Sequence, residues 1–428
     1  MRYRYRNDEE MKDSGVEWIG KIPKDWSRAK IGHICEIGRG RVISSEEILD
    51  NKGIYPVYSS QTKDNGVMGY IDTFDFEGDY VTLTTDGANA GTVFKRSGKF
   101  NCTNVCGTLK NRKKDLDLSY LAYALSIETK PFVRLDINPK LMNNEMSNIN
   151  ICITGLIEQE KIANFLDEKT SQFDLIISKK EELIKKLEEA KKSLISEVVT
   201  GKVKVVKTDD GYEIVKRKKD EMKDSGIEWL GEIPKEWEIY RSKYLWKKEK
   251  RPILDNYDVV TAFRDGEVTL RTNRRTEGYT FAIKETGYQG VLKGDLVISA
   301  MDAFAGAMGI SDSEGKCSPV YSVCSPIKKL VPDYYKYLLK EMSQKGYILS
   351  LAKGIRERST DFRYSEFANT TLLYPNFNEQ EIISSYINIK LNNIDEFKTK
   401  LKCQIEKLKE AKQSLISEAV TGKIEILD

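Results

Sequence analysis

The chain has 428 residues, of which 40% are hydrophobic and 32% are charged, and its formal net charge is +3. This length predicts two to three domains with ordinary cores, and the near balance of charge excludes a general polycation, so any nucleic-acid surface must be local. The seven cysteines do not follow zinc spacings, only His33 could assist them, and no apolar run reaches the roughly 18 residues of a membrane span, so we expect reduced thiols, no bound metal and a cytoplasmic protein.

The first predicted block covers residues 1–152 and opens with a tryptophan-containing motif, residues 11–26. The motif returns at residues 222–237 with 12 of 16 positions identical, and the two copies hold four of the five tryptophans. We interpret them as an irregular collar packed under a domain, with direct stacking on nucleic-acid bases as the alternative. The rest of the block has short β-like runs, turn residues and one short helix near residues 118–127, which predicts a small α+β domain.

A long helix is predicted over residues 153–202 and again over residues 375–428. Residues 187–202 and 408–423 match at 13 of 16 positions, at an offset of 221. Glu158 suits the N-terminal end of the helix dipole, and Gly201 stands where a C-cap glycine is expected. About 39 residues would form a rod of roughly 58 Å.

Apolar residues recur along both helices at alternating spacings of four and three, which is typical of a heptad seam. Two such helices in one chain most simply pack on each other, and the alternative is that each packs on its own domain. The predicted seam residues are Ile162, Leu166, Phe173, Ile176, Leu183, Leu187, Leu194, Ile383, Ile387, Ile394, Phe397, Leu401, Leu408 and Leu415.

Residues 203–221 form a predicted linker hairpin, in which two β-like runs flank a polar turn ending in Gly211. A second block, residues 222–374, then shares landmarks with the first: residues 78–81 correspond to 294–297, and residues 88–91 to 303–306. The chain therefore reads as one scaffold that carries two diverged domains. We predict an α+β protein with a pseudo-twofold internal repeat, in which two α/β domains are separated by two long helices.

The sequence offers no recognisable catalytic set. Its Gly-Lys pairs lack the frame of a phosphate-binding Walker loop. The acidic segment at residues 167–169 is better explained as helix surface than as a magnesium site. We therefore expect a non-catalytic chain.

The whole layout resembles the specificity subunit of a type I restriction–modification system. The resemblance covers nearly the entire chain. It rests on the helix entries beginning at Gln159 and Gln380, on residues 193–202 with their copy, and on the opening motif at residues 15–23; residues 55–60 and 87–91 also resemble the target-recognition domains of that family.

The resemblance implies that each block is a target-recognition domain that reads one half of a split DNA sequence. It also implies that the two helices form an antiparallel coiled coil that spaces the half-sites and holds two DNA methyltransferase subunits, to which motor–nuclease subunits can be added. S-adenosylmethionine, ATP and Mg would be bound by those partners and not by this chain.

Two different target-recognition domains on a rigid spacer predict an asymmetric, bipartite target. The spacer sets the distance between the two half-sites. Arg pairs with guanine edges and Asn or Gln with adenine edges, so polar loop residues are the candidate DNA contacts, with solvated charge or phosphate contact as the alternative for each. The candidates are Arg39, Arg41, Gln61, Lys63, Asn65, Thr85, Asn89, Arg264, Arg271, Asn273, Arg274, Arg275, Arg356, Arg358 and Arg363.

Three other interpretations stay open. The chain could be a coiled-coil scaffold whose small domains bind protein, a single-chain enzyme whose site the sequence does not reveal, or a specificity protein of another DNA-modification or phage-defence assembly. Salt-dependent, sequence-specific DNA binding would separate the first from the main hypothesis.

Overall fold

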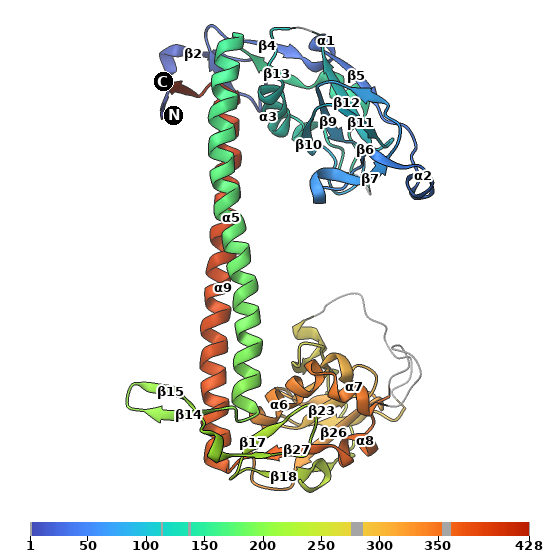
Figure 1. The fold of residues 1–428 in the computed structure, drawn as a ribbon, viewed down its shortest axis with the longest axis vertical. Coiled ribbons are helices and arrows are strands. Elements are labelled where there is room, and N and C mark those ends of the chain that lie inside the picture. The colour runs from blue at the N-terminus through green and yellow to red at the C-terminus, as the bar shows by residue number, and fades with distance from the viewer. Residues whose placement is uncertain (1, 113, 136–137, 275–285, 353–360, 428) are drawn as a thin grey trace. The chain divides into compact units, whose positions relative to one another are not determined.

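The computed structural model describes residues 2–112, 114–135, 138–274, 286–352 and 361–427 (Figure 1). It divides into two compact units, which are treated separately below. Unit 1 comprises Met1–Glu182 with Leu401–Asp428, and unit 2 comprises Leu183–Lys400. Two 44-residue helices, α5 (Leu156–Val199) and α9 (Phe377–Val420), each contribute residues to both units.

The core of unit 1 is an antiparallel sheet with strand order β10-β9-β12-β5. Helix α3 (Leu118–Glu128) packs on β9 and β10, and buries Leu121 and Leu125, which share a face because they are four residues apart. The strands are β5 (Cys35–Arg39), β9 (Tyr80–Thr84), β10 (Val93–Arg96) and β12 (Cys106–Asn111).

A second sheet of unit 1 has strand order β7-β6-β11-β8, with β6 and β11 parallel and the other pairs antiparallel. Residues 59–66 connect β6 to β7, and residues 85–92 connect β9 to β10. The strands are β6 (Lys52–Tyr58), β7 (Val67–Ile71), β8 (Phe76–Glu77) and β11 (Lys99–Cys102).

Unit 2 repeats this plan. Its main antiparallel sheet has order β19-β26-β23-β24, which matches β5-β12-β9-β10 strand for strand along the chain. Helix α6 (Pro332–Gln344) takes the place of α3. The strands are β19 (Trp246–Lys248), β23 (Leu296–Ser299), β24 (Met308–Ile310) and β26 (Tyr321–Pro326), beside the pairs β20 (Val260–Ala262) with β21 (Val268–Leu270) and β22 (Gln289–Val291) with β25 (Gly315–Cys317).

Short strand pairs and helices complete both units. The pairs are β2 (Met11–Asp13) with β3 (Lys21–Pro23), β4 (Ser27–Lys30) with β13 (Asn150–Ile153), β16 (Met222–Asp224) with β17 (Glu232–Pro234), and β18 (Glu238–Arg241) with β27 (Thr371–Tyr374). The short helices are α1 (Ile31–Ile34), α2 (Ser45–Asp50), α4 (Asn143–Asn148), α7 (Tyr347–Leu351) and α8 (Tyr364–Asn369). Within the described residues, every helix is too short or too polar to cross a membrane.

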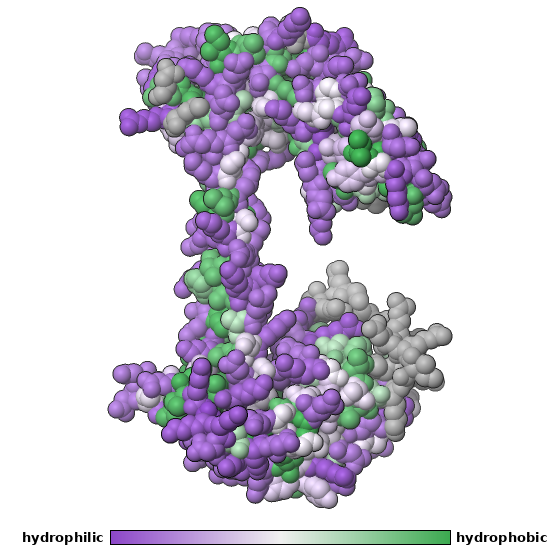
Figure 2. All heavy atoms as spheres, viewed as in Figure 1, coloured by the Kyte–Doolittle hydropathy of each residue, from purple (hydrophilic) through white to green (hydrophobic). Residues whose placement is uncertain are grey.

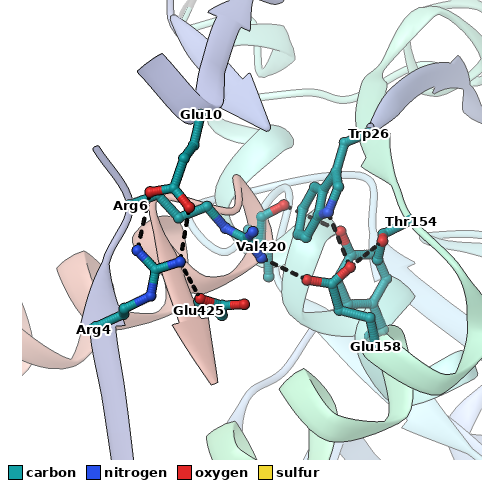
Figure 3. Close-up of polar contacts among 9 residues, drawn as sticks. Arg4, Arg6, Glu10, Trp26, Thr154, Glu158, Val420 and Glu425 are labelled. Carbon is teal, nitrogen blue, oxygen red and sulfur yellow. Dashed lines mark hydrogen bonds and ion pairs between the residues drawn. The ribbon is translucent and has the colours of Figure 1, made fainter. Parts of the chain in front are cut away.

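The tryptophan motif forms a collar around the first turn of α5, as predicted. Arg6 donates to Glu158 Oε1 at 2.7 Å, and Trp26 Nε1 donates to Glu158 Oε2 at 3.0 Å (Figure 3). Thr154 Oγ1 donates to the same carboxylate. Trp26 is 1% exposed, which supports packing and not base stacking for this residue. Glu158 therefore fastens the collar to the helix, in addition to its place in the first turn.

Unit 2 contains the same collar around the first turn of α9. Arg217 is 2.5 Å from Glu379 Oε1, and Trp237 Nε1 donates to Glu379 Oε2 at 2.8 Å. Gly201, at the end of α5, has a φ of +74°, and a Cβ there would lie 2.5 Å from Pro234. The sequence prediction of a C-cap glycine is confirmed, and the close approach of the collar is a second reason for glycine at that position.

One further strand pair lies beside each collar. In unit 1, β1 (Arg2–Tyr5) pairs with β28 (Ile424–Leu427), and Arg4 forms ion pairs with Glu10 and Glu425 (Figure 3). In unit 2, β14 (Val203–Thr208) pairs with β15 (Gly211–Lys216) as the predicted hairpin. The register Arg2↔Leu427 corresponds to Val206↔Glu213 once the repeat offsets of 211 and 221 are applied, so the two ladders are equivalent.

Within each unit the two long helices pack against each other and run antiparallel. In unit 1, Asp174 contacts Lys412 and Lys180 contacts Gln404. In unit 2, Glu188 contacts Lys398 and Lys191 contacts Asp395. The antiparallel direction follows in each unit because residue numbers rise along α5 while those of their partners fall along α9.

The predicted seam is partly wrong. Ile162, Leu166, Ile383, Ile387 and Leu401 are buried, and Phe173, Leu187, Leu194, Ile394, Leu408 and Leu415 are half-buried. Ile176, Leu183 and Phe397, however, are exposed, while Ile177 and Ile405 are buried in their place. Apolar residues stand side by side at 176–177 and at 183–184, so the same four-and-three spacing fits two neighbouring faces, and only packing selects one.

Candidate nucleic-acid interface

Two connections of unit 1 lie side by side and carry most of its predicted DNA contacts. They are residues 59–66, after β6, and residues 85–92, after β9. Asn89 Nδ2 donates to the carbonyl oxygen of Ser60 at 3.2 Å, which ties the two together. The structure therefore brings Asn89 next to the segment that contains Gln61, Lys63 and Asn65.

Arg39 and Thr85 meet at Asp86, at the edge of the main sheet. Arg39 donates to Asp86 Oδ2 at 3.2 Å, and the Thr85 hydroxyl donates to the same oxygen at 2.8 Å. Lys140 Nζ lies 3.7 Å from Asp86 Oδ1. Arg39 is exposed but already has a carboxylate partner, so it orders the loop as well as adding positive charge to this edge.

Arg41 is held between two carboxylates, Glu47 at 2.6 Å and Asp75 at 3.0 Å. The hydrogen bond with Glu47 raises the pKa of Arg41 and lowers the pKa of Glu47. A guanidinium with two acidic neighbours is a weak candidate for base contact, because both neighbours would repel phosphate.

The tip of the β6–β7 connection is polar and exposed. Gln61, Lys63 and Asn65 are all exposed, while Gly66 is buried. Asp64 and Asn65 have φ values of +48° and +53°, in the left-handed region. That conformation costs L residues roughly 1–2 kcal/mol, and Asn and Asp adopt it more readily than others.

Arg96, which no sequence pattern marked, supports this tip from below. Its side chain is 2% exposed, and its guanidinium carbon lies 3.6 Å from the ring centroid of Tyr58 and 4.4 Å from that of Phe94. Burial lowers the pKa of Arg96. Its Nη1 has no hydrogen-bond partner among the described residues, so the rings stabilise most of this cation. A Cβ on Gly66 would lie 3.0 Å from Arg96 Nη2.

The equivalent place in unit 2 is the β20–β21 turn, residues 263–267. Arg264 is exposed and donates to Asp302 Oδ1 at 2.8 Å. Arg274 forms ion pairs with Asp265 and Glu267, at 2.7 and 3.1 Å. This turn therefore combines arginines with the acidic residues that orient them.

The other described candidates of unit 2 lie apart from that turn or donate hydrogen bonds to residues of the β20–β21 pair. Asn273 Nδ2 donates to Thr269, and Arg271 Nε donates to Thr261. Arg363 is paired with Asp361 at 2.5 Å and lines a cavity of about 640 Å³ with Lys248 and Tyr321. Arg275, Arg356 and Arg358 lie outside the described residues.

These surfaces carry guanidinium, ammonium and carboxamide groups, which can bind a polyanion and read polar edges. Among the residues that the structure describes, no group of three or more His, Cys, Asp or Glu side chains could hold a metal ion. Amide and guanidinium groups on connections above a rigid sheet suit recognition of base edges and phosphates.

Comparisons with known proteins agree with this arrangement. The sequence profile of the type I restriction modification DNA specificity domain matches residues 23–188. A type I specificity subunit fragment of Mycoplasma pneumoniae, described as an N-terminus, is 50% identical over 139 residues, which are 32% of this chain and 74% of that relative. The chain belongs to the type I specificity subunits.

Another specificity subunit of Mycoplasma pneumoniae is 47% identical over 161 residues, and the match covers 37% of this chain and 42% of that subunit. The chain thus spans less than half the length of this longer relative.

A solved structure confirms the fold of the specificity subunit at low identity. That structure comes from work on complex assembly and conformational transition of the type I R-M system. The similarity has a TM-score of 0.66 and 12% sequence identity, and it covers 94% of this chain and 99% of that one. Two mixed α/β domains with paired long helices are therefore the architecture of this specificity subunit, as its sequence predicts.

Proposed function

We propose that this specificity subunit recognises an asymmetric, bipartite sequence in double-stranded DNA, with one half-site for each target-recognition domain. The domains are residues 1–152 and 222–374. One observation supports this most. The main sheets of the two units have the same strand order and each unit has an equivalent collar, but the connections between their strands carry different polar residues. A duplicated frame with diverged tips is what two different half-sites require.

The charge distribution supports DNA as the ligand. The net charge is only +3, yet Arg39, Lys63 and Lys140 gather near the connections of unit 1, and Arg264 lies in the turn of unit 2. Local basic groups of this kind give binding that weakens as salt rises. The exposed carboxamides would then supply base discrimination.

The long helices are proposed to hold two DNA methyltransferase subunits. In unit 1, Tyr3, Tyr5, Phe173 and Ile176 line an open groove of about 460 Å³ beside Leu415. The repeat offsets place Ile214, Lys216, Ile394, Phe397 and Leu194 at the equivalent positions of unit 2. Lys216 there replaces Tyr5, and the apolar Ile214 and Phe397 are exposed. Figure 2 shows hydrophobic side chains interrupting the hydrophilic surface of the helices. Two equivalent apolar patches favour two copies of one partner.

Catalysis and cofactors are proposed to belong to the partners. In this hypothesis the chain is a non-catalytic subunit, the methyltransferase subunits bind S-adenosylmethionine, and motor–nuclease subunits that join the complex bind ATP and Mg. The chain itself contributes DNA recognition and the geometry of assembly, and the complex acts in the cytoplasm.

The test is single-molecule methylome sequencing of cells that co-express this chain with its neighbouring methyltransferase, against cells without the chain. We expect a split, asymmetric motif with adenine methylated in both halves. Exchange of residues 27–151 for another target-recognition domain should change one half of that motif only. If the wild-type chain produced no new motif, the proposed function would be wrong, and a pull-down of helix-bound partners would test the scaffold alternative.

A further inference from the structure

The tip of the β6–β7 connection of unit 1, residues 62–65, carries polar side chains that have no partner among the described residues. Thr62, Lys63, Asp64 and Asn65 are exposed, and none of their side chains forms a hydrogen bond or ion pair with another described residue. Arg39, by contrast, is paired with a carboxylate. Groups without protein partners can bind a ligand without first breaking an internal contact.

The base of the same connection is fixed. Ser59 donates its amide to Gly66 O at 2.9 Å, which closes the loop. Gln61 Nε2 donates to Val67 O, and Asn89 holds Ser60 from the neighbouring connection. Arg96 packs beneath Gly66. A free tip on a fixed base is the arrangement expected of a preorganised recognition element.

The tip also has an unusual backbone. Among the residues that the structure describes, Asp64 and Asn65 are the only non-glycine residues with positive φ, and Gly66 follows at +81°. Strained backbone persists where its surroundings determine it, and it is enriched at binding sites. The left-handed turn leaves the Asn65 carboxamide exposed at the tip.

The equivalent turn of unit 2 shows that this is where the two domains diverge. Val259 bridges to Lys316 in parallel, as Val57 pairs with Asn101 in unit 1, so β20 and β6 occupy the same place. Residues 263–267 then replace the longer segment 59–66. An element that differs in length and sequence on a shared scaffold is expected to carry the differing specificity.

We propose that the β6–β7 turn of unit 1 enters a groove of duplex DNA and that Asn65 reads one base of the first half-site through its carboxamide. This inference rests on the proposed function. The Asn65 amide can donate and accept at once, which fits the N6 and N7 edge of adenine in the major groove. Lys63, two residues away, contributes charge toward a flanking phosphate.

Two substitutions separate the side chain from the backbone. Asn65→Gly keeps the left-handed conformation and removes the carboxamide. Asn65→Asp keeps its shape and its tolerance of that conformation, but leaves only an acceptor. We expect the glycine variant to relax one position of the first half-site in the methylome. The aspartate variant should bind duplex DNA with the wild-type motif at least about tenfold more weakly, measured by fluorescence anisotropy of the complex with methyltransferase.

Asn143→Asp is the matched control. Asn143 is exposed in the first turn of α4 in unit 1, where an acidic residue suits the helix dipole. The substitution adds the same negative charge as Asn65→Asp, but outside the β6–β7 turn. This variant should keep the wild-type motif and affinity. The second half-site and the gap provide an internal control in every variant.

The outcomes distinguish this inference from the proposed function. If the wild-type chain yields a bipartite motif and both Asn65 variants methylate it unchanged, the Asn65 assignment is overturned while the proposed function stands. If Asn143→Asp weakens binding as much as Asn65→Asp, charge alone explains the effect and the assignment is also overturned. No motif with the wild-type chain overturns both.

Discussion

Asp174 on α5 and Lys412 on α9 form an ion pair in unit 1, with 2.7 Å between Nζ and Oδ1. Unit 2 has the same pair with the helices exchanged, Lys191 with Asp395 at 2.9 Å. The offset of 221 converts Asp174 into Asp395 and Lys191 into Lys412. The aspartates are exposed and the lysines are half-buried, so these partly solvated pairs add little stability. They establish that the helices keep one antiparallel register in both units.

This register predicts the effect of lengthening the helices. Seven residues inserted after Glu182 and seven after Cys403 would preserve the heptad seam and extend each helix by about 10 Å. If the helices space the half-sites, the recognised gap should grow by about three base pairs at roughly 3.4 Å each, with both half-sites unchanged. Methylome sequencing measures the gap. Seven residues inserted between Asp209 and Asp210, in the hairpin turn, should leave the gap unchanged. An unchanged gap in the helix variant would contradict the hypothesis that the long helices set the spacing of the half-sites.

Leu187 and Leu183 provide a matched pair of positions on α5. Leu187 is half-buried in the helix seam, whereas Leu183 is 38% exposed. Leu187→Asp places a charge in the seam and should lower the free energy of unfolding by about 2 kcal/mol or more. Leu183→Asp should change it by less than about 0.5 kcal/mol. Urea unfolding followed by circular dichroism compares them. A loss below about 0.5 kcal/mol for Leu187→Asp would mean that Leu187 does not lie in the seam, and a loss for Leu183→Asp as large as that expected for Leu187→Asp would mean that Leu183 does.

The outward apolar residues Ile176 and Phe397 are equivalent under the repeat and are 43% and 46% exposed. Ile176→Asp and Phe397→Asp should leave folding intact, because neither side chain is in the core. Each should weaken binding of one methyltransferase subunit by at least about tenfold. Native mass spectrometry should then find one bound subunit in each single variant and none in the double variant. Two tightly bound subunits in the double variant would place the docking surface elsewhere.

Glu158 joins the collar of unit 1 to α5 through Arg6 and Trp26. Glu158→Gln retains an oxygen for Trp26 but leaves the Arg6 guanidinium, which is 11% exposed, without its carboxylate. We expect a loss of about 2–3 kcal/mol in the free energy of unfolding. Glu160→Gln, an exposed position in the same turn, should change it by no more than about 0.5 kcal/mol. Comparable losses in denaturant titrations would show that general charge in the turn, and not the collar contact, is responsible.

Thiol reactivity tests the burial of the cysteines in the structure. Cys403 is exposed and the other six are buried. Burial also raises the pKa of Cys35, Cys152, Cys317 and Cys324 to about 12, so little thiolate forms there at pH 8. A thiol reagent should label one site of the wild-type chain in its native state and all seven cysteines in urea. It should label no site of native Cys403→Ser. Rapid labelling of a second native thiol would contradict the packing of the sheets.

Much of this architecture could be predicted because a duplication states each feature twice. The tryptophan motif, the glycine caps and the helix pair could all be predicted from residues that recur at fixed offsets. The face of the helix seam was not, because Ile176 and Ile177 fit the heptad spacing equally well. Arg96 was also missed, because a single arginine in a strand gives no sign that it will be buried on Tyr58. Ion pairing of Arg41 with Asp75 and of Arg264 with Asp302 joins residues that are 34 and 38 positions apart, so their availability to DNA could not be inferred from composition.

The ladder of β1 with β28 has a consequence for folding. Its four residue pairs all have equivalents among the six pairs of β14 with β15. Asp209 and Asp210 alone join β14 to β15, whereas Arg2 and its partner Leu427 in unit 1 are far apart along the chain. Closing the ladder of unit 1 therefore costs more conformational entropy than closing the hairpin of unit 2, because this cost rises with the length of the loop that is closed.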